Sequence, residues 1–203
     1  MSPRRYRMGA RADRIQDTRD RLVVAAMRLH AERGVLATRW DEIAAEAGVS
    51  TATMYRHFPA LAELVPACAR TVFDLIKPPT VAEASPQFAT YDDAADRFEH
   101  LVRVSVHCYA AGAGWLHAAH RERDFVPELD AALRLIEDTL RVLVRAAAGG
   151  ELPDDAAAEL FVLCNFPLWK QLLDAGPSAG ATEETLVTLV RDAASRLDAR
   201  STR

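Results

Sequence analysis

A short segment, residues 50–58 with the sequence STATMYRHF, gathers side chains that form hydrogen bonds in several ways. Thr51 and Thr53 carry hydroxyls that can donate or accept, and Arg56 carries a planar guanidinium with several donors. A guanidinium can make a two-pronged contact to guanine O6 and N7, whereas a hydroxyl suits many bases and specifies weakly. The chemistry that these residues offer is therefore recognition of base edges.

Two neighbouring side chains suit phosphate oxygens instead. Tyr55 has an apolar ring to brace against the protein and a hydroxyl at its tip, and His57 can donate a ring N–H. Simpler interpretations stay open. Tyr55 and His57 can be partly buried core residues, and Arg56 can be a solvated surface residue. Thr53 can bond to a backbone carbonyl of its own helix.

The segment ends a pattern of two short helices with a sharp turn between them. Residues 40–58 read WDEIAAEAGVSTATMYRHF, and the AGVS stretch separates the two helical patterns. Gly48 lets the backbone turn where a Cβ would be strained, and Ser50 is a natural N-cap. Met54 and Phe58 point inward, which leaves Thr51, Ala52, Tyr55 and Arg56 on the outer face. We therefore predict a helix-turn-helix unit, a plan used to place a helix in the DNA major groove.

The residues before this unit predict the elements that support it. Helical spacing of apolar residues predicts a first helix from about residue 17 to residue 33, ended by Gly34. Thr38 precedes Asp41 by three residues, which predicts an N-terminal cap for the second helix. Arg39 lies beside that cap and suits a contact with the DNA backbone. The arm before the first helix could follow phosphates, enter a minor groove or be disordered; its arginines are Arg4, Arg5, Arg7, Arg11 and Arg14.

Composition favours an all-α protein with two domains. Half of the 203 residues are hydrophobic, and Ala, Leu, Arg and Glu dominate, without alternating Val/Ile/Thr-rich runs. We predict a DNA-binding domain at residues 1–58 and a larger helical domain at residues 59–203. In the larger domain the patterns predict a loop at 77–90 and helices at 61–76, 91–111, 114–123, 127–148, 155–174 and 182–199.

Charge is distributed unevenly between these two parts. Residues 1–58 contain eleven Arg and seven Asp or Glu, a net charge of +4, whereas residues 59–203 carry −8, for a total of −4. Phosphates are attracted to the first part and repelled by the second. This asymmetry indicates a polyanion contact at one end, although a solvated, uneven surface remains an alternative.

The cysteines and the N-terminal composition bear on location. Cys68, Cys108 and Cys164 are odd in number, widely spaced and embedded in apolar patterns, which is typical of reduced core residues. No apolar signal segment follows the Arg-rich start, and no run of about 18 apolar residues is present. We expect a cytoplasmic protein that neither is exported nor spans a membrane.

The stretches TRDRLVVAAMRLHAERG and ATRWDEIAAEAGVSTATMYRHFP resemble the TetR family of bacterial transcriptional regulators over about 45 residues. The AGVS turn and the T-x-Y-x-H-F ending carry most of the resemblance. It implies a homodimer with reading units in successive major grooves, and a C-terminal domain whose small ligand usually releases the DNA. It further implies base contacts by Thr51, Ala52, Thr53 and Arg56, and phosphate contacts by Thr38, Tyr55 and His57. Leu61 stands where the family often has a Lys, which puts that phosphate contact in doubt.

A dimer is also expected on energetic grounds. One short helix makes too few base contacts for a specific affinity of about 10⁻⁸ M. Two copies should meet half-sites one turn, about 34–36 Å, or a multiple of that apart. The last two predicted helices are the candidates for the interface, although some of their residues will belong to the intrachain core; the candidates are Phe161, Leu168, Leu172, Leu186, Val190, Ala193 and Leu197.

The sequence also predicts a ligand pocket among the middle helices. Aromatic and weakly polar residues of the middle helices could line an apolar cavity, although each is also suited to the core. Asn165 beside Pro167 is of interest because a proline inside a helix frees a backbone carbonyl near a polar amide. The pair could form a binding spot or only a kink in the helix. The candidates are Phe73, Phe98, Val102, Ser105, Tyr109, Trp115, His117, Cys164, Asn165 and Trp169.

Other functions find little support in the sequence. The sequence contains no Gly-rich phosphate loop, no nucleophile elbow and no paired carboxylates set in an apolar run, so we expect neither an enzyme nor a bound cofactor. His107 and His117 lie on different predicted helices, and His117 and His120 have no further ligand at suitable spacing except Glu122, so we expect no metal site. The leading hypothesis is a repressor that leaves a palindromic operator when a small apolar ligand binds. The alternatives are a ligand-independent regulator or activator, and a helical small-molecule carrier or enzyme.

Overall fold

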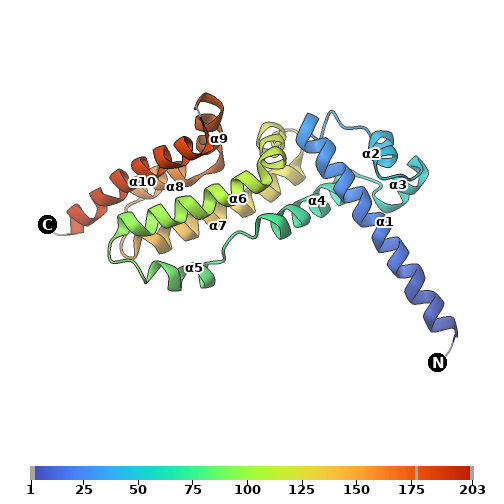
Figure 1. Ribbon diagram of the computed structural model, residues 1–203, viewed down its shortest axis with the longest axis horizontal. Coiled ribbons are helices and arrows are strands. Elements are labelled where there is room, and N and C mark those ends of the chain that lie inside the picture. The colour runs from blue at the N-terminus through green and yellow to red at the C-terminus, as the bar shows by residue number, and fades with distance from the viewer. Residues whose placement is uncertain (1–2, 177, 202–203) are drawn as a thin grey trace. The chain divides into compact units, whose positions relative to one another are not determined.

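The computed structural model describes residues 3–176 and 178–201, and every regular element in these ranges is an α-helix (Figure 1). The prediction of an all-α fold is confirmed. None of the helices in the described ranges combines the length and apolarity needed to span a membrane. The helices are α1 (Pro3–Arg33), α2 (Trp40–Glu46), α3 (Thr51–His57), α4 (Leu61–Ile76), α5 (Val81–Phe88), α6 (Ala94–Glu122), α7 (Pro127–Ala148), α8 (Asp154–Cys164), α9 (Phe166–Ala175) and α10 (Ala179–Ser201).

The chain packs as two compact units. The first comprises Met1–Asp74 and Gly114–Ala132, and the second comprises Leu75–Ala113 and Leu133–Arg203. Helices α6 and α7 each contribute to both units. The predicted DNA-binding segment 1–58 lies within the first unit, which also takes up parts of α4, α6 and α7. That a functional domain ends at residue 58 stays a prediction.

One apolar core holds the first four helices together. Leu22, Ala26 and Leu29 form a buried stripe on α1, spaced at helical intervals, and Met54 of α3 and Phe58 after it are fully buried against the same core. Large buried side chains of this kind, such as leucine, methionine and phenylalanine, contribute about 2–5 kcal/mol each when compared with alanine. The core therefore fixes which face of α3 is turned away from the protein.

Two predictions were wrong: the start of the first helix, and the absence of a helix from residues 77–90. Helix α1 begins at Pro3 rather than near residue 17. The predicted loop at 77–90 contains α5, because Thr80 and Glu83 form a capping box. The Thr80 Oγ1 accepts from the backbone N–H of Glu83 at 3.3 Å, and the Glu83 carboxylate accepts from the N–H of Thr80 at 2.9 Å. This reciprocal pair satisfies donors that would otherwise destabilise a short helix.

The predicted helices 91–111 and 114–123 are one continuous helix, α6. A glycine inside a helix costs about 1 kcal/mol relative to alanine, which a long, packed helix can tolerate. Gly114 also has a packing role: a Cβ there would lie 2.7 Å from the Cβ of Ala31. The glycine thus permits a close approach of α1 to α6 inside the first unit.

The predicted helix at 155–174 is divided at Asn165. This residue is extended, with φ −90° and ψ 152°, and serves as the C-cap of α8 and the N-cap of α9. Its Oδ1 accepts from the backbone N–H of Phe166 at 2.8 Å, and Pro167 occupies the first turn of α9, where a missing N–H is tolerated. The polar amide therefore completes a helix break, one of the interpretations that the sequence left open.

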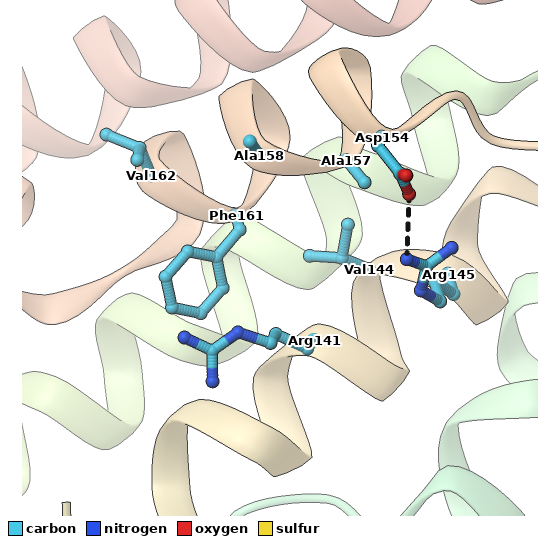
Figure 2. A pocket seen from close by; sticks show the side chains of 8 residues that line it. All are labelled: Arg141, Val144, Arg145, Asp154, Ala157, Ala158, Phe161 and Val162. Carbon is cyan, nitrogen blue, oxygen red and sulfur yellow. Dashed lines mark hydrogen bonds and ion pairs between the residues drawn. The ribbon is translucent and has the colours of Figure 1, made fainter. Parts of the chain in front are cut away.

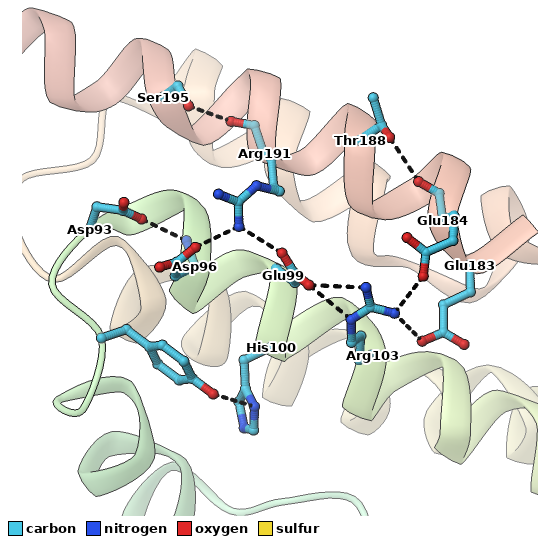
Figure 3. A network of polar contacts seen from close by, with 11 residues as sticks. Asp93, Asp96, Glu99, His100, Arg103, Glu183, Glu184, Thr188, Arg191 and Ser195 are labelled. Carbon is cyan, nitrogen blue, oxygen red and sulfur yellow. Dashed lines mark hydrogen bonds and ion pairs between the residues drawn. The ribbon is translucent and has the colours of Figure 1, made fainter. Parts of the chain in front are cut away.

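Helix α10 packs against α8 and α9 and is joined to α6 by a network of ion pairs (Figure 3). Arg103 contacts Glu99, Glu183 and Glu184 at 2.8–3.0 Å. Arg191 contacts Asp96 at 2.5 Å and Glu99 at 2.6 Å. A single exposed pair contributes little, but here Glu99 serves two arginines, so that the pairs share ordered side chains. The network fixes the register of α10 along α6.

Candidate nucleic-acid interface

The turn between α2 and α3 has the geometry that the AGVS pattern predicts. Gly48 has a positive φ of 67°, a region that side chains with a Cβ adopt rarely. The N–H of Val49 returns to the carbonyl of Ala44 at 2.9 Å, which closes the end of α2. Ser50 Oγ then accepts from the N–H of Thr53 at 3.2 Å, so the predicted N-cap of α3 is confirmed. The turn and the cap together set the direction in which α3 leaves the core.

Helix α3 presents the outer face that the sequence predicts. Thr51, Ala52 and Arg56 are exposed, and Tyr55 is 50% exposed. Thr53 is half-buried, and its hydroxyl lies 3.0 Å from that of Ser50, rather than on a backbone carbonyl. The exposed side chains carry a hydroxyl, a methyl, a phenol and a guanidinium. They form a short polar surface on a rigid helix.

Tyr55 is braced by an aromatic neighbour that the sequence analysis did not identify. The ring of Trp40, at the start of α2, stacks on the Tyr55 ring with 5.6 Å between centroids and 25° between planes. A hollow of about 480 Å³ lies beside this pair and is lined by Thr38, Arg39, Trp40, Asp41, Thr51 and Tyr55. Trp40 and Tyr55 lie on different helices, 15 residues apart, so no periodic pattern in the sequence predicts that their rings stack.

The predicted cap of α2 was wrong by one residue. Arg39, not Thr38, is the N-cap, and its backbone N–H donates to the Glu42 carboxylate at 3.0 Å. Thr38 Oγ1 instead donates to the carbonyl of Gly34 at 2.6 Å, within the loop before α2. Both residues still lie at the edge of the hollow beside Tyr55. Thr38 is therefore held by the loop that follows α1.

Arg39 is exposed and bound to its neighbour Asp41. Both guanidinium contacts to this carboxylate measure 3.0 Å, and the hydrogen bond from Arg39 lowers the pKa of Asp41. An exposed pair of this kind exchanges partners at little cost, because water solvates both groups. Arg39 remains available to a phosphate at the start of α2.

His57 ends α3 and is half-buried. Burial, followed by the charges of Arg56 and Arg19, lowers its pKa, so the neutral ring dominates at neutral pH. Arg19 of α1 donates to the carbonyl of His57 at 3.0 Å, and its guanidinium lies 4.1 Å from the centre of the Phe58 ring. The sequence analysis did not identify Arg19, which holds the C-terminal end of α3 on α1.

The basic arm is only partly described. The side chains of Arg4, Arg5, Arg7 and Arg11 lie outside the described residues, and Arg14 is exposed. The arm's predicted contacts with phosphates or a minor groove stay a prediction.

The predicted pocket residues are distributed over both units. Phe73, Trp115 and His117 lie in the first unit, where Trp115 is buried and His117 is exposed. In the second unit the Tyr109 hydroxyl donates to the carbonyl of Cys164 at 2.8 Å, and the Tyr109 ring contacts Trp169. Burial raises the pKa of Tyr109 and raises that of Cys164 to about 12. In the second unit Phe98, Val102, Ser105, Tyr109, Cys164 and Trp169 are buried, and Asn165 is half-buried.

A groove of the second unit lies elsewhere, between α7 and α8 (Figure 2). It has a volume of about 320 Å³ and apolar walls that include Val144 and Val162. The Arg141 guanidinium lies 4.5 Å from the centre of the Phe161 ring, and Arg145 contacts Asp154 at 3.5 Å. Phe161 is the one predicted interface residue that lines this groove.

The predicted interface residues divide into two groups by exposure. Phe161, Leu168 and Leu172 are half-buried in the single chain. The candidates on α10 are buried within the chain itself, so they pack α10 on its own neighbours; they are Leu186, Val190, Ala193 and Leu197. Val162 and Leu189, which were not predicted, are 55% and 41% exposed on α8 and α10.

The described residues, 3–176 and 178–201, include histidine, cysteine and carboxylate side chains of the kinds that bind metals. Within these ranges no three His, Cys, Asp or Glu side chains gather as a candidate metal site. Cys68, Cys108 and Cys164 are free thiols, and all three are buried.

Comparison with known protein families identifies the helix-turn-helix part of the chain. Residues 22–68 match the model of the family described as bacterial regulatory proteins, tetR family. This range covers the second half of α1, all of α2 and α3, and the start of α4. No curated protein matches the sequence.

Solved structures share the fold over most of the chain. A putative TetR-family transcriptional regulator from Syntrophomonas wolfei is 18% identical, with a TM-score of 0.64, covering 88% of this chain and 95% of that one. A putative transcriptional regulator from Saccharomonospora viridis, in complex with choline, is 23% identical, with a TM-score of 0.63 and coverage of 86% and 96%. The multidrug binding protein EbrR, complexed with imidazole, is 21% identical, with a TM-score of 0.60 and coverage of 84% and 88%. At these identities the likeness concerns the fold.

Proposed function

We propose that this chain is a DNA-binding transcriptional regulator of the tetR family, and that it is a repressor that binds a palindromic operator as a homodimer. The match of residues 22–68 to the model of that family supports the proposal, as does the fold shared with a putative TetR-family regulator. The observation that carries the proposal is the outer face of α3, which exposes Thr51, Tyr55 and Arg56 on a helix capped by Ser50 and anchored by buried Met54. A rigid helix with this face can enter a major groove. A regulator of bacterial genes acts in the cytoplasm, where we expect it to be found.

The contacts of each reading unit follow from side-chain chemistry. Arg56 makes the two-pronged contact to guanine, and Thr51, Ala52 and Thr53 contact neighbouring base edges. Thr38, Arg39, Tyr55 and His57 hold phosphates, with Ser50 at the N-terminus of the helix. The stack of Trp40 on Tyr55 supports this assignment, since it holds the phenol without using its hydroxyl.

The dimer forms through the last helices of the second unit. The exposed apolar side chains Val162 and Leu189, on helices that pack together, suit an interface with a second copy. The half-buried Phe161, Leu168 and Leu172 extend this surface. The buried Leu186, Val190, Ala193 and Leu197 support α10 from beneath.

A small apolar ligand regulates the repressor by binding in the second unit and releasing the operator. Two proteins of the same fold carry small molecules, choline in one and imidazole in the other. The side chains around Tyr109 and Trp169 supply aromatic faces and few polar anchors, as small-molecule sites commonly do. Phe73, Trp115 and His117 belong to the first unit, so the site proposed in the second unit does not include them. A ligand-independent regulator or an activator is the second candidate function.

Selection of bound sequences from random duplex DNA by the purified protein tests the proposal. We expect a palindromic consensus whose half-site centres are one turn, about 34–36 Å, or a multiple of that apart. Recovery of no preferred sequence, at low as well as moderate salt, would contradict DNA recognition by this chain. Titration of the operator complex with a panel of small apolar molecules then tests release, for which an affinity change of about 5- to 150-fold is expected.

A further inference from the structure

A buried carboxylate lies next to the loop that leads into the helix-turn-helix. Glu122, the last residue of α6, is only 7% exposed, although glutamate is seldom buried without a partner. Its Oε2 accepts from the backbone N–H of Val35 at 2.7 Å and from that of Leu36 at 3.0 Å. These residues are 87 and 86 positions away in the sequence, and they belong to the loop between α1 and α2.

Arg121, the residue before Glu122, adds hydrogen-bond donors to this contact, whereas Glu122 only accepts. Arg121 donates to the carbonyl of Arg33, the last residue of α1, at 3.1 Å, and contacts Glu122 Oε1 at 3.0 Å. The end of α6 therefore binds a carbonyl at the end of α1 and two N–H groups of the loop that follows it. Burial alone would raise the pKa of Glu122, but the hydrogen bonds from Leu36, Arg121 and Val35 outweigh it and lower the pKa. The carboxylate is thus ionised at neutral pH, and its bonds are charge-assisted.

The surrounding sequence leaves room for this contact. Gly34 has a φ of +96°, and a Cβ there would lie 1.9 Å from Glu122 Oε1. Within α6, Gly114 precedes Glu122 and allows Ala31 of α1 to approach the helix closely. Gly34, Gly114 and the Arg121–Glu122 ion pair thus all help to pack α1 and the following loop against residues 114–122. All of these residues belong to the first unit.

We propose that Glu122 is a positioning residue for the recognition helix: its carboxylate fixes the loop at Val35 and Leu36, and thereby the placement of α2 and α3, on the end of α6. The inference rests on the proposed function. Helix α6 runs without interruption from residues of the second unit to Glu122, so it is one of the segments that join a dimerising unit to a reading unit. Loosening its end should therefore relax the spacing at which two reading units bind, without changing the bases that each unit reads.

The test compares Glu122→Gln with Glu63→Gln, which makes the same chemical change at an exposed glutamate of the first unit. Each purified full-length protein is measured against the operator selected by the wild type, and against operators with half-sites one base pair closer or further apart. For Glu122→Gln we expect the preference for the native spacing to fall by about 2- to 30-fold, the usual range for residues that modulate coupling. The half-site consensus should stay the same, and Glu63→Gln should match the wild type.

The outcomes separate this inference from the proposed function. A wild type without a palindromic consensus defeats the proposed function, whatever Glu122 does. A wild type that prefers one spacing, together with a Glu122→Gln protein that prefers it as sharply, overturns the inference, even if the variant is less stable or binds more weakly overall. If Glu122→Gln does not fold, Arg121→Gln removes the exposed half of the contact, and relaxed spacing supports the inference while unchanged spacing overturns it.

Discussion

Individual side chains of α3 differ in what their chemistry can specify. Arg56 is the exposed residue with the geometry for a two-pronged base contact, whereas Thr51 and Ala52 offer a hydroxyl and methyl groups that several bases accommodate. Tyr55, stacked on Trp40, is ordered before any DNA arrives, which reduces the entropy lost on binding. Specificity should therefore depend more on Arg56 than on its neighbours.

Replacing Arg56 by alanine should cost about 1–3 kcal/mol of discrimination at one base pair of each half-site, because the two-pronged contact is lost. Fluorescence anisotropy with the selected operator and with single-base variants of it measures the effect. Arg70→Ala, at an exposed arginine of α4, is the matched control. Equal discrimination by Arg56→Ala and the wild type would show that Arg56 contacts only phosphate.

His30 should make the stability of the protein depend on pH. Its side chain is 1% exposed, its Nδ1 has no partner among the described residues, and burial lowers its pKa to about 4, against a smaller raising effect of Glu122. The unfolded chain therefore binds a proton on this residue between pH 6.5 and about 4, where the folded chain does not. Stability should be full above pH 6.5 and fall by about 3 kcal/mol toward pH 4.

Urea denaturation at several pH values tests this expectation against His30→Leu, which should lose most of the pH dependence in that window. His117→Gln, at an exposed histidine, should keep it. If His30→Leu is destabilised by acid as steeply as the wild type, other groups carry the effect.

At the scale of elements, caps and turns decide where the short helices begin and how they are directed. Helices α2 and α3 are too short to be stable alone, so their ends and their buried faces must supply the stability. Ser50, Gly48 and the Arg39–Glu42 pair perform this role for the helix-turn-helix, and Thr80 with Glu83 performs it for α5.

Ser50→Ala should lower the free energy of unfolding by about 1 kcal/mol, because the N–H of Thr53 loses its side-chain acceptor at the start of α3. Ser195→Ala removes a hydroxyl that donates to a carbonyl within α10, and should change stability by less than about 0.5 kcal/mol. Chemical denaturation of both variants gives the comparison. Equal effects would mean that the Ser50 hydroxyl is not acting as a cap.

At the scale of the whole molecule, the proposed function depends on two copies acting together. The net negative charge of residues 59–203 disfavours contact between this part of the chain and DNA. DNA binding should therefore be confined to the helix-turn-helix in residues 1–58 of each copy. In the proposed dimer each helix-turn-helix makes too few contacts alone, so the operator affinity should depend on how firmly the last helices of the two copies associate.

Val162→Asp should convert the dimer to a monomer, since a charge at an exposed apolar position of the proposed interface would be buried without a partner. Operator affinity should then fall by about 10³-fold, toward non-specific binding. Analytical ultracentrifugation and anisotropy measure both effects, with Val142→Asp on α7, 49% exposed, as control. A dimeric Val162→Asp protein with full affinity would place the interface elsewhere.

Local patterns in the sequence were sufficient for much of the candidate site. The AGVS turn, the cap at Ser50 and the outward face of α3 depend on residues within one or two helical turns of each other, so their consequences can be read from spacing. The all-α class follows from composition and periodicity in the same way. Helix ends in regions of Ala and Gly were predicted less well, because propensity alone does not show whether Gly114 ends a helix or allows α1 to approach it.

The sequence by itself determined that this protein is helical and that a capped helix with Arg56 and Tyr55 follows a glycine turn. Only the tertiary structure decided which distant residues hold that helix in place: Trp40 under Tyr55, Arg19 at the carbonyl of His57, and Glu122 on the loop before α2. It likewise buried four predicted interface residues of α10 within the chain. The physical reason is range: caps and turns act over a few residues, whereas burial and buried hydrogen bonds join side chains whose sequence separation carries no signal.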